Sequence, residues 1–323
     1  MDTIVKFSFP SLGIKGGEIN SVAFGGVMWY GVVIALGMLM AIAYASYRCK
    51  QHGIKVDDLI DIAIFTIFFG VVGARAYYVI FDTDKSHYKS FMDVIAIWNG
   101  GLAIYGGIIA GAITVIIVCL IKKLNWRKLF DAVGPGVMLA QAMGRWGNFF
   151  NGEAYGSIVE EGHPLYFARM GLISNNTRLE FATSEMVYVH PCFLYESLWN
   201  ILGFVLINLF YKKKKFDGQI ALYYFAWYGF GRMFIEGLRT DALYIGNTGI
   251  RVSQLLGFLL FAIATALIIY GLIYVKNHPD SKLAFAGFVD PASEKETVEE
   301  DEEDEEETSE TVEKANEEDG EDN

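Results

Sequence analysis

The chain has 323 residues, of which 53% are hydrophobic and 20% are charged. Long apolar runs with few charges recur along it, which argues against a soluble globular protein and predicts a polytopic, all-α membrane protein. The formal net charge of −12 is misleading, because residues 290–323 hold 19 of the 38 acidic residues and only 2 of the 26 basic ones. The other residues carry a small positive net charge, which suits anionic lipid headgroups; no nucleic-acid partner is expected.

The three cysteines, Cys49, Cys119 and Cys192, have no paired spacing and no histidines at metal-ligand intervals. They therefore indicate neither a disulfide framework nor a zinc site. Cys119 lies in an apolar run, where a small buried hydrophobic residue is expected. We expect no metal and no cofactor.

Seven apolar stretches are long enough, at about 20 residues each, to cross the hydrocarbon core as helices. The first is long enough to stay in the membrane as a span, and it lacks the features of a cleaved signal peptide. The fourth is rich in glycine and alanine, and the sixth contains polar residues. The predicted spans are residues 22–45, 59–81, 102–121, 129–150, 191–211, 219–238 and 253–275.

Basic residues gather in the loops that follow the first, third and fifth predicted spans. The positive-inside rule makes this side cytoplasmic, so that the N-terminus lies outside and the C-terminus inside. The longest connection, residues 151–190, then lies outside and is predicted to form a small head. The basic residues are Arg48, Lys50, Lys55, Lys122, Lys123, Arg127, Lys128 and Lys212 to Lys215.

The sequence predicts two parts, a seven-span membrane domain at residues 1–285 and an acidic cytoplasmic tail at residues 286–323. The tail has too few apolar residues to bury a core, so a solvated, disordered segment is expected. A regulatory or partner-binding tail is the alternative.

Residues 144–156, GRWGNFFNGEAYG, place strongly polar side chains where an apolar segment ends. Arg145, Asn148, Asn151 and Glu153 lie here among four glycines. Glycine permits sharp bends and close approach of another group, and an arginine at membrane depth is costly unless it meets an anion. This stretch therefore predicts an anion site at the outer membrane face.

A second polar group lies in the sixth span, where Tyr228, Arg232, Glu236 and Arg239 follow one narrow stripe of a helix. A salt bridge between Arg232 and Glu236 is the structural explanation, and it would leave the second arginine in need of a partner. Arg239 has a further alternative, which is to extend its charged end to the outer interface. Ionisable residues inside a membrane are usually functional, so we expect this stripe to serve the same site.

Three further polar positions have two explanations each. Tyr105, between glycines at the outer end of the third span, is either a reactive phenol or an interfacial tyrosine. His190 opens the fifth span, where it either transfers protons or makes a structural hydrogen bond. Tyr30 belongs to an aromatic pair that packing explains, although its hydroxyl needs a partner at that depth.

Arginines and carboxamides together form a typical phosphate site, through charge-assisted and bidentate hydrogen bonds. The chain contains no P-loop and no dinucleotide fingerprint, so a nucleotide phosphate is not expected. Because the abundant phosphate in a membrane is that of a phospholipid, we predict a site for an anionic lipid built on Arg145, Arg232 and Arg239.

Residues 144–156 resemble the signature of the prolipoprotein diacylglyceryl transferase family. Trp29-Tyr30-Gly31, the glycine pairs within 100–107, His190-Pro191 and the stripe in the sixth span also resemble the family, in matching order from about residue 20 to 275. The resemblance implies a multi-pass protein of the bacterial plasma membrane that moves the diacylglyceryl group of phosphatidylglycerol onto the lipobox cysteine of a prolipoprotein. A thioether forms and glycerol phosphate leaves.

The resemblance and the residue patterns together give a set of expected site residues. The expected catalytic residues are Arg145, Arg232, Tyr105 and Glu153. We expect Glu153 and Glu236 to orient the arginines. The expected substrate-binding residues are Tyr30, Asn148, Asn151, Gly156, Tyr228, Glu236, Arg239 and His190.

The chain departs from the family pattern at Tyr105, where many members have a histidine that is often regarded as the catalytic base. Tyrosine, with an ordinary pKa of about 10, is a poor base at neutral pH. Three readings stay open: Tyr105 acts with help from an arginine, the base lies elsewhere, or the arginines activate the incoming thiol. We favour the last, because the pKa of a cysteine, about 8.5, falls beside cations.

Two other classes of protein explain part of the sequence. A transporter or flippase for an anionic lipid or phosphate compound would account for the arginines and the interrupted spans. It predicts inverted repeats, but the pattern of residues 144–156 occurs once. A membrane scaffold that binds partners through its tail would leave the stripe in the sixth span unexplained.

Overall fold

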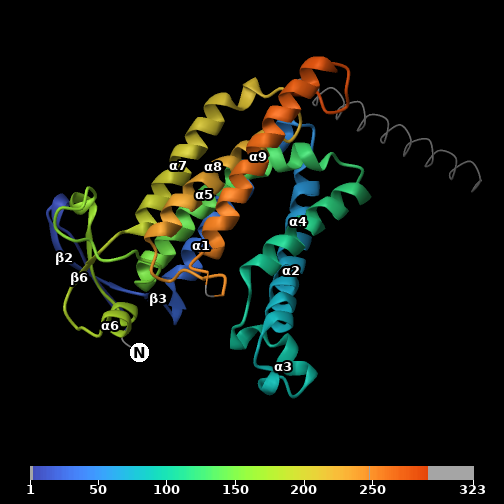
Figure 1. Cartoon of the computed structure of the whole chain (residues 1–323). Helices are drawn as coiled ribbons and strands as arrows, with labels where there is room; N and C mark the ends of the chain where they lie inside the picture. The colour runs from blue at the N-terminus through green and yellow to red at the C-terminus, as the bar shows by residue number, and fades with distance from the viewer. Residues whose placement is uncertain (1–2, 247, 290–323) are drawn as a thin grey trace, which may run out of the picture. The chain divides into compact units, whose positions relative to one another are not determined.

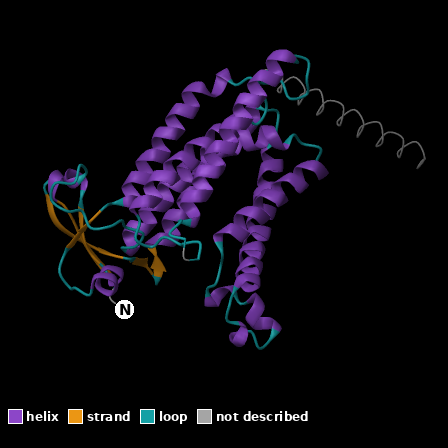
Figure 2. Cartoon of the chain, in the orientation of Figure 1, coloured by secondary structure: helices purple, strands orange, loops and turns teal. Residues whose placement is uncertain are grey.

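The computed structural model describes residues 3–246 and 248–289, so most of the predicted acidic tail lies outside the described residues. The chain forms two compact units (Figures 1 and 2). Of the described residues, the first unit comprises 3–46, 125–246 and 248–285, and the second comprises 47–124 and 286–289. We describe each unit by itself.

The first unit is a bundle of long helices (Figure 1). Small and aromatic residues let these helices pack closely. At the contact between α8 and α9, a Cβ on Gly229 would lie 2.6 Å from the carbonyl oxygen of Gly257, so glycine is what lets the two backbones meet. Trp199 of α7 and Trp227 of α8 stack with ring centroids 4.2 Å apart. The helices of this bundle are α1 (Trp29–Gln51, which continues into the second unit), α5 (Trp126–Asn151), α7 (Cys192–Phe210), α8 (Gln219–Ile235) and α9 (Val252–Asn277).

The two stacked tryptophans also exchange hydrogen bonds between their helices. The indole N–H of Trp199 donates to the carbonyl oxygen of Trp227 at 3.0 Å, and the indole N–H of Trp227 donates to the carbonyl oxygen of Trp199 at 2.9 Å. Both indole donors are therefore satisfied inside an apolar contact, which holds α7 and α8 together without a charge.

One end of this bundle carries a buried ion pair that joins α5 to the start of α8. The ammonium of Lys214 lies 2.9 Å from the carboxylate of Asp131, and both side chains are fully buried. Asp131 also accepts hydrogen bonds from the backbone N–H groups of Gly218 and Ala221, each at 2.9 Å. It thus satisfies donors at the N-terminus of α8 that would otherwise lack partners.

At the other end of the first unit, the strands form a four-stranded antiparallel sheet in the order β2-β1-β5-β6 (Figure 2). Its inner face packs Val5, Leu172 and Val189 against Phe149 of α5 and Phe193 of α7. The predicted external head at residues 151–190 therefore shares its sheet with the N-terminal residues, a pairing that we did not predict. The elements are β1 (Ile4–Phe9), η1 (Pro10–Leu12), β2 (Ile14–Asn20), η4 (Tyr166–Ala168), β5 (Met170–Ile173), α6 (Asn175–Phe181) and β6 (Val187–Val189).

The start of the first predicted span was wrong by seven residues. Residues 22–28 form a hairpin of β3 (Val22–Phe24) and β4 (Val27–Met28), and helix α1 begins only at Trp29. Gly25 and Gly26, at the turn, have φ angles of +56° and +83°, a conformation that no right-handed helix adopts.

The second unit is a hairpin of α2 and α4 joined by a structured loop. A Cβ on Gly106 would lie 2.4 Å from the carbonyl oxygen of Gly73, so the two helices touch backbone to backbone. Arg75 of α2 is buried and donates hydrogen bonds to four loop carbonyls, those of Asp93, Val94, Gly100 and Gly101, at 2.7–3.0 Å. The elements are α2 (Val56–Phe81), η2 (Lys85–His87), α3 (Phe91–Ile95), η3 (Ile97–Asn99) and α4 (Ile104–Ile121).

A helix is found for each of the seven predicted spans. Within the described residues, five of them are long and apolar enough to cross a membrane: α1, α2, α4, α9, and α7 extended by the following turn η5 (Tyr211–Lys213). Helix α5 carries several charges, and α8 has 17 residues before it tightens into η6 (Glu236–Leu238). The chain is thus a mostly helical protein with several helices suited to a membrane.

Candidate functional site

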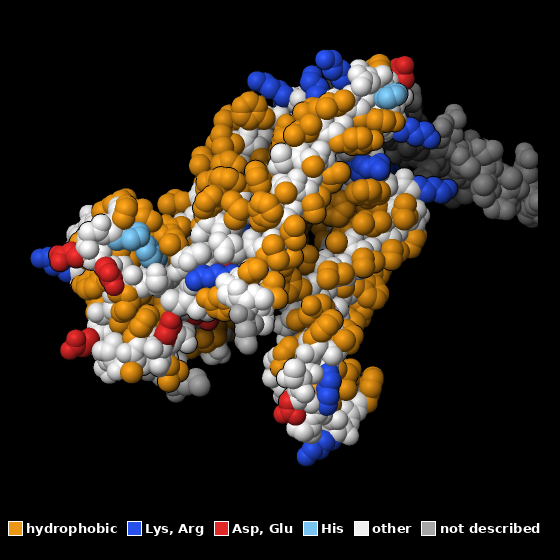
Figure 3. Space-filling view, viewed as in Figure 1, with side chains coloured by type: hydrophobic (Ala, Val, Ile, Leu, Met, Phe, Trp, Pro, Cys, Tyr) orange, Lys and Arg blue, Asp and Glu red, His pale blue; other side chains and the backbone are white. Residues whose placement is uncertain are grey.

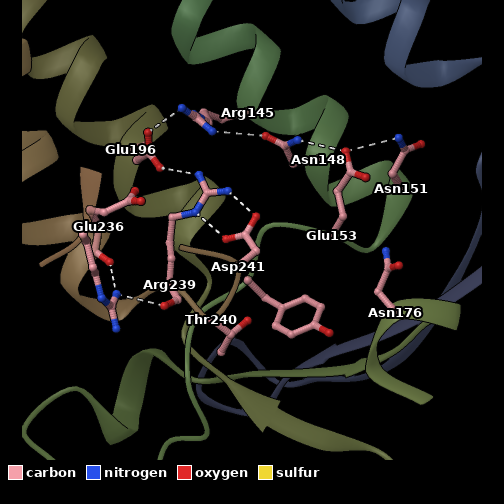
Figure 4. A network of polar contacts seen from close by, with 12 residues as sticks. Arg145, Asn148, Asn151, Glu153, Asn176, Glu196, Glu236, Arg239, Thr240 and Asp241 are labelled. Atoms are coloured by element: carbon pink, nitrogen blue, oxygen red, sulfur yellow. Dashed lines mark hydrogen bonds and ion pairs between the residues drawn. The ribbon is translucent and has the colours of Figure 1, made fainter. Parts of the chain in front are cut away.

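The site begins where α5 ends. Gly152 follows the helix with φ +59°, a left-handed conformation typical of a helix C-terminus, and it turns the chain so that Glu153 folds back. The carboxylate of Glu153 accepts hydrogen bonds from the side-chain amides of Asn148 at 3.0 Å and Asn151 at 3.3 Å (Figure 4). Asn148 in turn accepts a hydrogen bond from Arg145 at 3.4 Å. Glu153 therefore orients two amides directly and reaches Arg145 only through Asn148.

A second carboxylate, Glu196 in the first turns of α7, is the centre of the site. One of its oxygens lies 2.7 Å from Arg145, and the other lies 2.9 Å from Arg232 and 3.5 Å from Arg239. Glu196 is 4% exposed, so these charges meet in a largely dry environment where their attraction is strong. The three predicted arginines, which lie on α5, on α8 and just after η6, are brought together by a residue to which we had assigned no role.

Each of the two later arginines has a further acidic partner. Arg232 lies 2.6 Å from Glu236, as the structural explanation of the stripe predicts. The guanidinium of Arg239 makes a bidentate contact with the carboxylate of Asp241 (Figure 4). Its Nε donates to Oδ1 at 2.8 Å and its Nη2 donates to Oδ2 at 2.6 Å. Its side chain is 11% exposed, so it does not extend freely to the interface, whereas that of Arg145 is 22% exposed.

The pairing with Arg239 affects the ionisation of Asp241. Burial by itself would raise the pKa of this carboxyl, but the hydrogen bonds and the charge of Arg239 outweigh burial and hold the pKa below its ordinary value. Asp241 is therefore ionised at neutral pH, and the pair is fully charged.

A fourth arginine, which the sequence analysis did not single out, lies at the start of α9. Arg251 donates hydrogen bonds to the backbone carbonyls of Glu236 and Arg239. Among the described residues it has no carboxylate partner. Four arginines thus face the three carboxylates of Glu196, Glu236 and Asp241, which leaves one positive charge in excess in this part of the site.

Gly156 lies where three segments meet. Its N–H donates to the carbonyl oxygen of His190 at 2.9 Å. A Cβ at this position would lie 2.7 Å from the carbonyl oxygen of Leu238 and 2.9 Å from the sulfur of Cys192. Only glycine fits such close backbone contact, so this residue sets how the loop lies against the end of α8.

His190 is buried, and its side chain contacts aromatic groups and not the arginines of the described site. Its Nδ1 lies 3.3 Å from the hydroxyl of Tyr195, and its ring centroid lies 4.9 Å from that of His163. Burial, and secondly the charge of His163, lower the pKa of His190. The imidazole is therefore neutral at neutral pH, as a structural hydrogen-bonding histidine would be.

The three predicted tyrosines lie in different surroundings. Tyr30, at the start of α1, packs its ring on Gly147, where a Cβ would lie 2.8 Å from the ring. Tyr228 lies one turn before Arg232 on α8, and its ring stacks on that of Tyr224 with centroids 6.1 Å apart. Tyr105 belongs to the second unit and lies in the first turn of α4.

The site is thus a cluster of fixed guanidinium groups, amides and carboxylates. The positive excess is confined to the part around Glu196, because the carboxylate of Glu153 balances it over the whole site. Within the described residues, no group of three or more histidines, cysteines or carboxylates has the geometry of a metal site. Fixed arginines at the end of a helical bundle bind phosphate and stabilise negative charge that develops during a reaction.

Comparison with known proteins identifies the family. The family model described as prolipoprotein diacylglyceryl transferase matches residues 20–270. A protein from Streptococcus equi subsp. zooepidemicus named phosphatidylglycerol–prolipoprotein diacylglyceryl transferase is 42% identical over 259 residues, which cover 77% of this chain and 94% of the relative. Proteins of the same name from Streptococcus agalactiae and Streptococcus pyogenes are 43% identical, over 76% and 77% of this chain and 91% and 90% of the relatives. The chain therefore belongs to the prolipoprotein diacylglyceryl transferase family.

Proposed function

We propose that this protein transfers the diacylglyceryl group of phosphatidylglycerol to the thiol of the lipobox cysteine in a prolipoprotein. The sulfur of the cysteine bonds to the carbon of the diacylglyceryl group that carries the phosphate. The bond between that carbon and the phosphate oxygen breaks, and glycerol phosphate leaves. The names of the relatives support this reaction. The observation in this chain that carries it is the convergence of Arg145, Arg232 and Arg239 on Glu196.

The arginines act on the leaving group. The phosphodiester of the lipid carries one negative charge, and the departing phosphate monoester gains a second. Guanidinium groups that are already in place stabilise this developing charge without reorganising. Arg145 is the most exposed of the three, and among the described residues it donates only to Glu196 and Asn148, which leaves donors for a phosphate. Arg232 provides the second contact, and Asn148 and Asn151 provide neutral donors.

Glu196 serves as a positioning residue. Three cations so close together would repel one another, and the buried carboxylate offsets this repulsion while it occupies only one edge of each guanidinium. The carboxylate of Glu236 likewise offsets the positive charge of Arg232. The planar guanidinium suits this arrangement because it presents several N–H groups in a fixed fork.

The proton of the incoming thiol leaves before or during attack. We favour activation by the positive charge of the site, which lowers the pKa of a cysteine and increases its thiolate fraction. Tyr105 then orients a reactant by a hydrogen bond. The enzyme's own cysteines have no role in this scheme.

In the membrane, we propose seven spans with the N-terminus outside and the C-terminus in the cytoplasm of a bacterium. The three basic loops support this orientation. Helices α5 and α8 complete the number of spans, since their charged residues lie near their ends or pair inside the bundle. Residues 1–285 form the catalytic domain with its external head, and residues 286–323 form a separate cytoplasmic tail.

The direct test is to incubate the purified protein with phosphatidylglycerol and a lipobox peptide. The expected result is a mass increase of one diacylglyceryl group on the peptide's cysteine, absent when that cysteine has been alkylated. A transporter or flippase would leave the peptide unchanged and would move labelled lipid across proteoliposome membranes. That outcome would refute the transferase.

A further inference from the structure

An apolar groove of about 440 Å³ lies between α7 and α8, with one residue of α9 at its edge. Its walls are mainly aromatic, and they include the stacked pair Trp199 and Trp227, together with Tyr223, Phe230 and Phe261. Because the two indole N–H groups are already bonded to backbone carbonyls, the stacked pair presents apolar surface to the groove. Such a lining favours a hydrocarbon occupant.

The groove follows α7 and the turn η5 from Trp199 to Lys213. At a rise of 1.5 Å per residue this distance is roughly 21 Å, which exceeds the roughly 15 Å half-thickness of the hydrocarbon core. An extended acyl chain therefore fits along it. Lys213 lies about 26 Å along the helix from Glu196, so the mouth of the groove is at the opposite end of α7 from the arginine site.

Positive charge gathers at this mouth. Lys213 lines the groove, with its ammonium 5.2 Å from the ring centroid of Phe210. Lys212 and Lys215 are also exposed. Figure 3 shows lysine and arginine side chains at this end of the molecule, beyond the apolar surface of the helices.

These three exposed lysines have no ion-pair partner among the described residues. The nearby carboxylates of Asp131 and Asp217 are both occupied by Lys214, which points inward. A buried lysine thus takes up the local negative charge, and the three others present an uncompensated positive surface at the end of an apolar groove.

We infer that this groove binds one anionic phospholipid, with an acyl chain between α7 and α8 and the headgroup phosphate on Lys212, Lys213 and Lys215. Basic residues near a membrane surface attract anionic lipids by about 1 kcal/mol each, which is about fivefold in affinity. The acidic residues 290–323 match the charge of the lysines, but they contain almost no large apolar side chains to fill the groove. The apolar lining therefore favours the lipid.

The test uses the full chain in nanodiscs of phosphatidylcholine and a phosphatidic acid whose acyl chain carries a diazirine. Phosphatidic acid is not the proposed diacylglyceryl donor, and mass spectrometry of the labelled peptides separates this groove from the arginine site. We expect labelling of peptides within residues 199–230 to exceed that from a phosphatidylcholine with the same chain. The triple variant K212Q/K213Q/K215Q should lose more than tenfold of this labelling.

Two further variants separate the headgroup from the chain. K50Q/K55Q/K123Q removes three exposed lysines of the second unit and should label as the wild type does. A226W fills the groove while leaving the lysines in place, and it should also lose the label. Melting temperatures of all variants verify folding. If A226W does not fold, the test rests on K212Q/K213Q/K215Q, because this variant changes only exposed side chains.

Four outcomes would overturn the inference. Equal labelling by the two lipids would mean ordinary contact with the surrounding bilayer. Unchanged labelling in K212Q/K213Q/K215Q would remove the headgroup contact, and unchanged labelling in a folded A226W would remove the chain contact. Carbodiimide cross-links from residues 290–323 to the three lysines, with no preference for phosphatidic acid, would make the acidic tail the occupant.

Discussion

Arg145 and Glu196 form a 2.7 Å ion pair between the end of α5 and the first turns of α7. The glutamate is almost completely buried and also contacts Arg232 and Arg239. Removing its charge therefore leaves Arg145 without a carboxylate partner among the described residues, and Arg232 and Arg239 with one each. Removing one arginine, in contrast, still leaves the glutamate paired. Glu196 is the residue whose loss the site tolerates least.

The substitution Glu196→Gln keeps the shape of the side chain and removes its charge. Breaking a buried ion pair from one side costs roughly 3–5 kcal/mol, so we expect a clearly lower melting temperature and a loss of most thioether formation. The control is Glu185→Gln, at an exposed position in the head, which should behave as the wild type does. Full activity in Glu196→Gln would show that the arginines keep their positions without it.

Arg145→Lys and Arg232→Lys each retain a positive charge but lose the planar fork. Since loss of one preorganised donor at a developing charge typically costs 10²–10³ in kcat, we expect reductions of about this size in each. The measurement is the rate of diacylglyceryl transfer to a lipobox peptide at saturating phosphatidylglycerol. Arg169→Lys, at a residue that contacts Tyr166 in the head, is the matched control. Full activity in both site variants would rule out the phosphate clamp.

Tyr105→Phe removes only the hydroxyl of the residue at which the sequence departs from the expected family pattern. If Tyr105 orients a reactant by one hydrogen bond, worth about 0.5–1.5 kcal/mol, the rate should fall roughly two- to tenfold. The pH profile should keep its shape, because the arginines and not the phenol activate the thiol. A loss beyond a thousandfold would instead make Tyr105 the proton acceptor, and an unchanged rate would remove any role in the reaction.

The lowered pKa of His190 predicts a specific pH dependence of stability. The unfolded histidine binds a proton below its ordinary pKa of about 6.5, whereas the buried one stays neutral to lower pH. The unfolded state therefore holds more protons in this window, and the free energy of unfolding falls as the pH drops below about 6.5.

The substitution His190→Gln should make the melting temperature less sensitive to acidification between pH 7.5 and pH 5.5. His278→Gln, an exposed histidine at the end of α9, should leave the wild-type slope unchanged. An identical slope in His190→Gln and in the wild type would show that His190 does not cause it.

Gly156→Ala tests the close contact between the loop and the end of α8. The new methyl group would lie 2.7 Å from the backbone oxygen of Leu238, which cannot move without shifting the segment that leads to Arg239. Overpacking of this kind typically costs 1–3 kcal/mol, and we expect the transfer rate to fall with it. Gly16→Ala, in β2 where a Cβ would meet open space and the backbone is not in the left-handed region, is the control without the contact. Equal effects of the two would mean that the contact is unimportant.

The helices and most of the site residues could be predicted because their signals are local. Apolar runs of sufficient length predict helices wherever nothing interrupts them, and the start of α1 was misplaced because Gly25 and Gly26 turn the chain. The ion pair of Arg232 and Glu236 follows from their spacing on one helix. Glu196 was visible in the sequence, but nothing local indicates that arginines from two other segments will meet it.

Other parts of the site carry no pattern at all. Arg251 binds backbone carbonyls, which every residue has, so its partners cannot be recognised from residue types. Asp241 comes two residues after Arg239 and does not share the helical spacing by which the residues of the stripe were recognised. The pairing of β1 with β5 joins residues more than 160 positions apart, and β1 is too short and too variably buried to reveal its partner.

The buried hydrogen bonds between Asp131 and the start of α8 restrict the movement of α8 relative to α5. The same two helices are linked again near their other ends, through Arg145, Glu196 and Arg232. If α8 moved along α5 by one helical turn, about 5.4 Å, both sets of contacts would break. If α5 and α8 cross the membrane as we propose, we expect them to tilt as one body in bilayers of different thickness, with a constant spacing between the arginines.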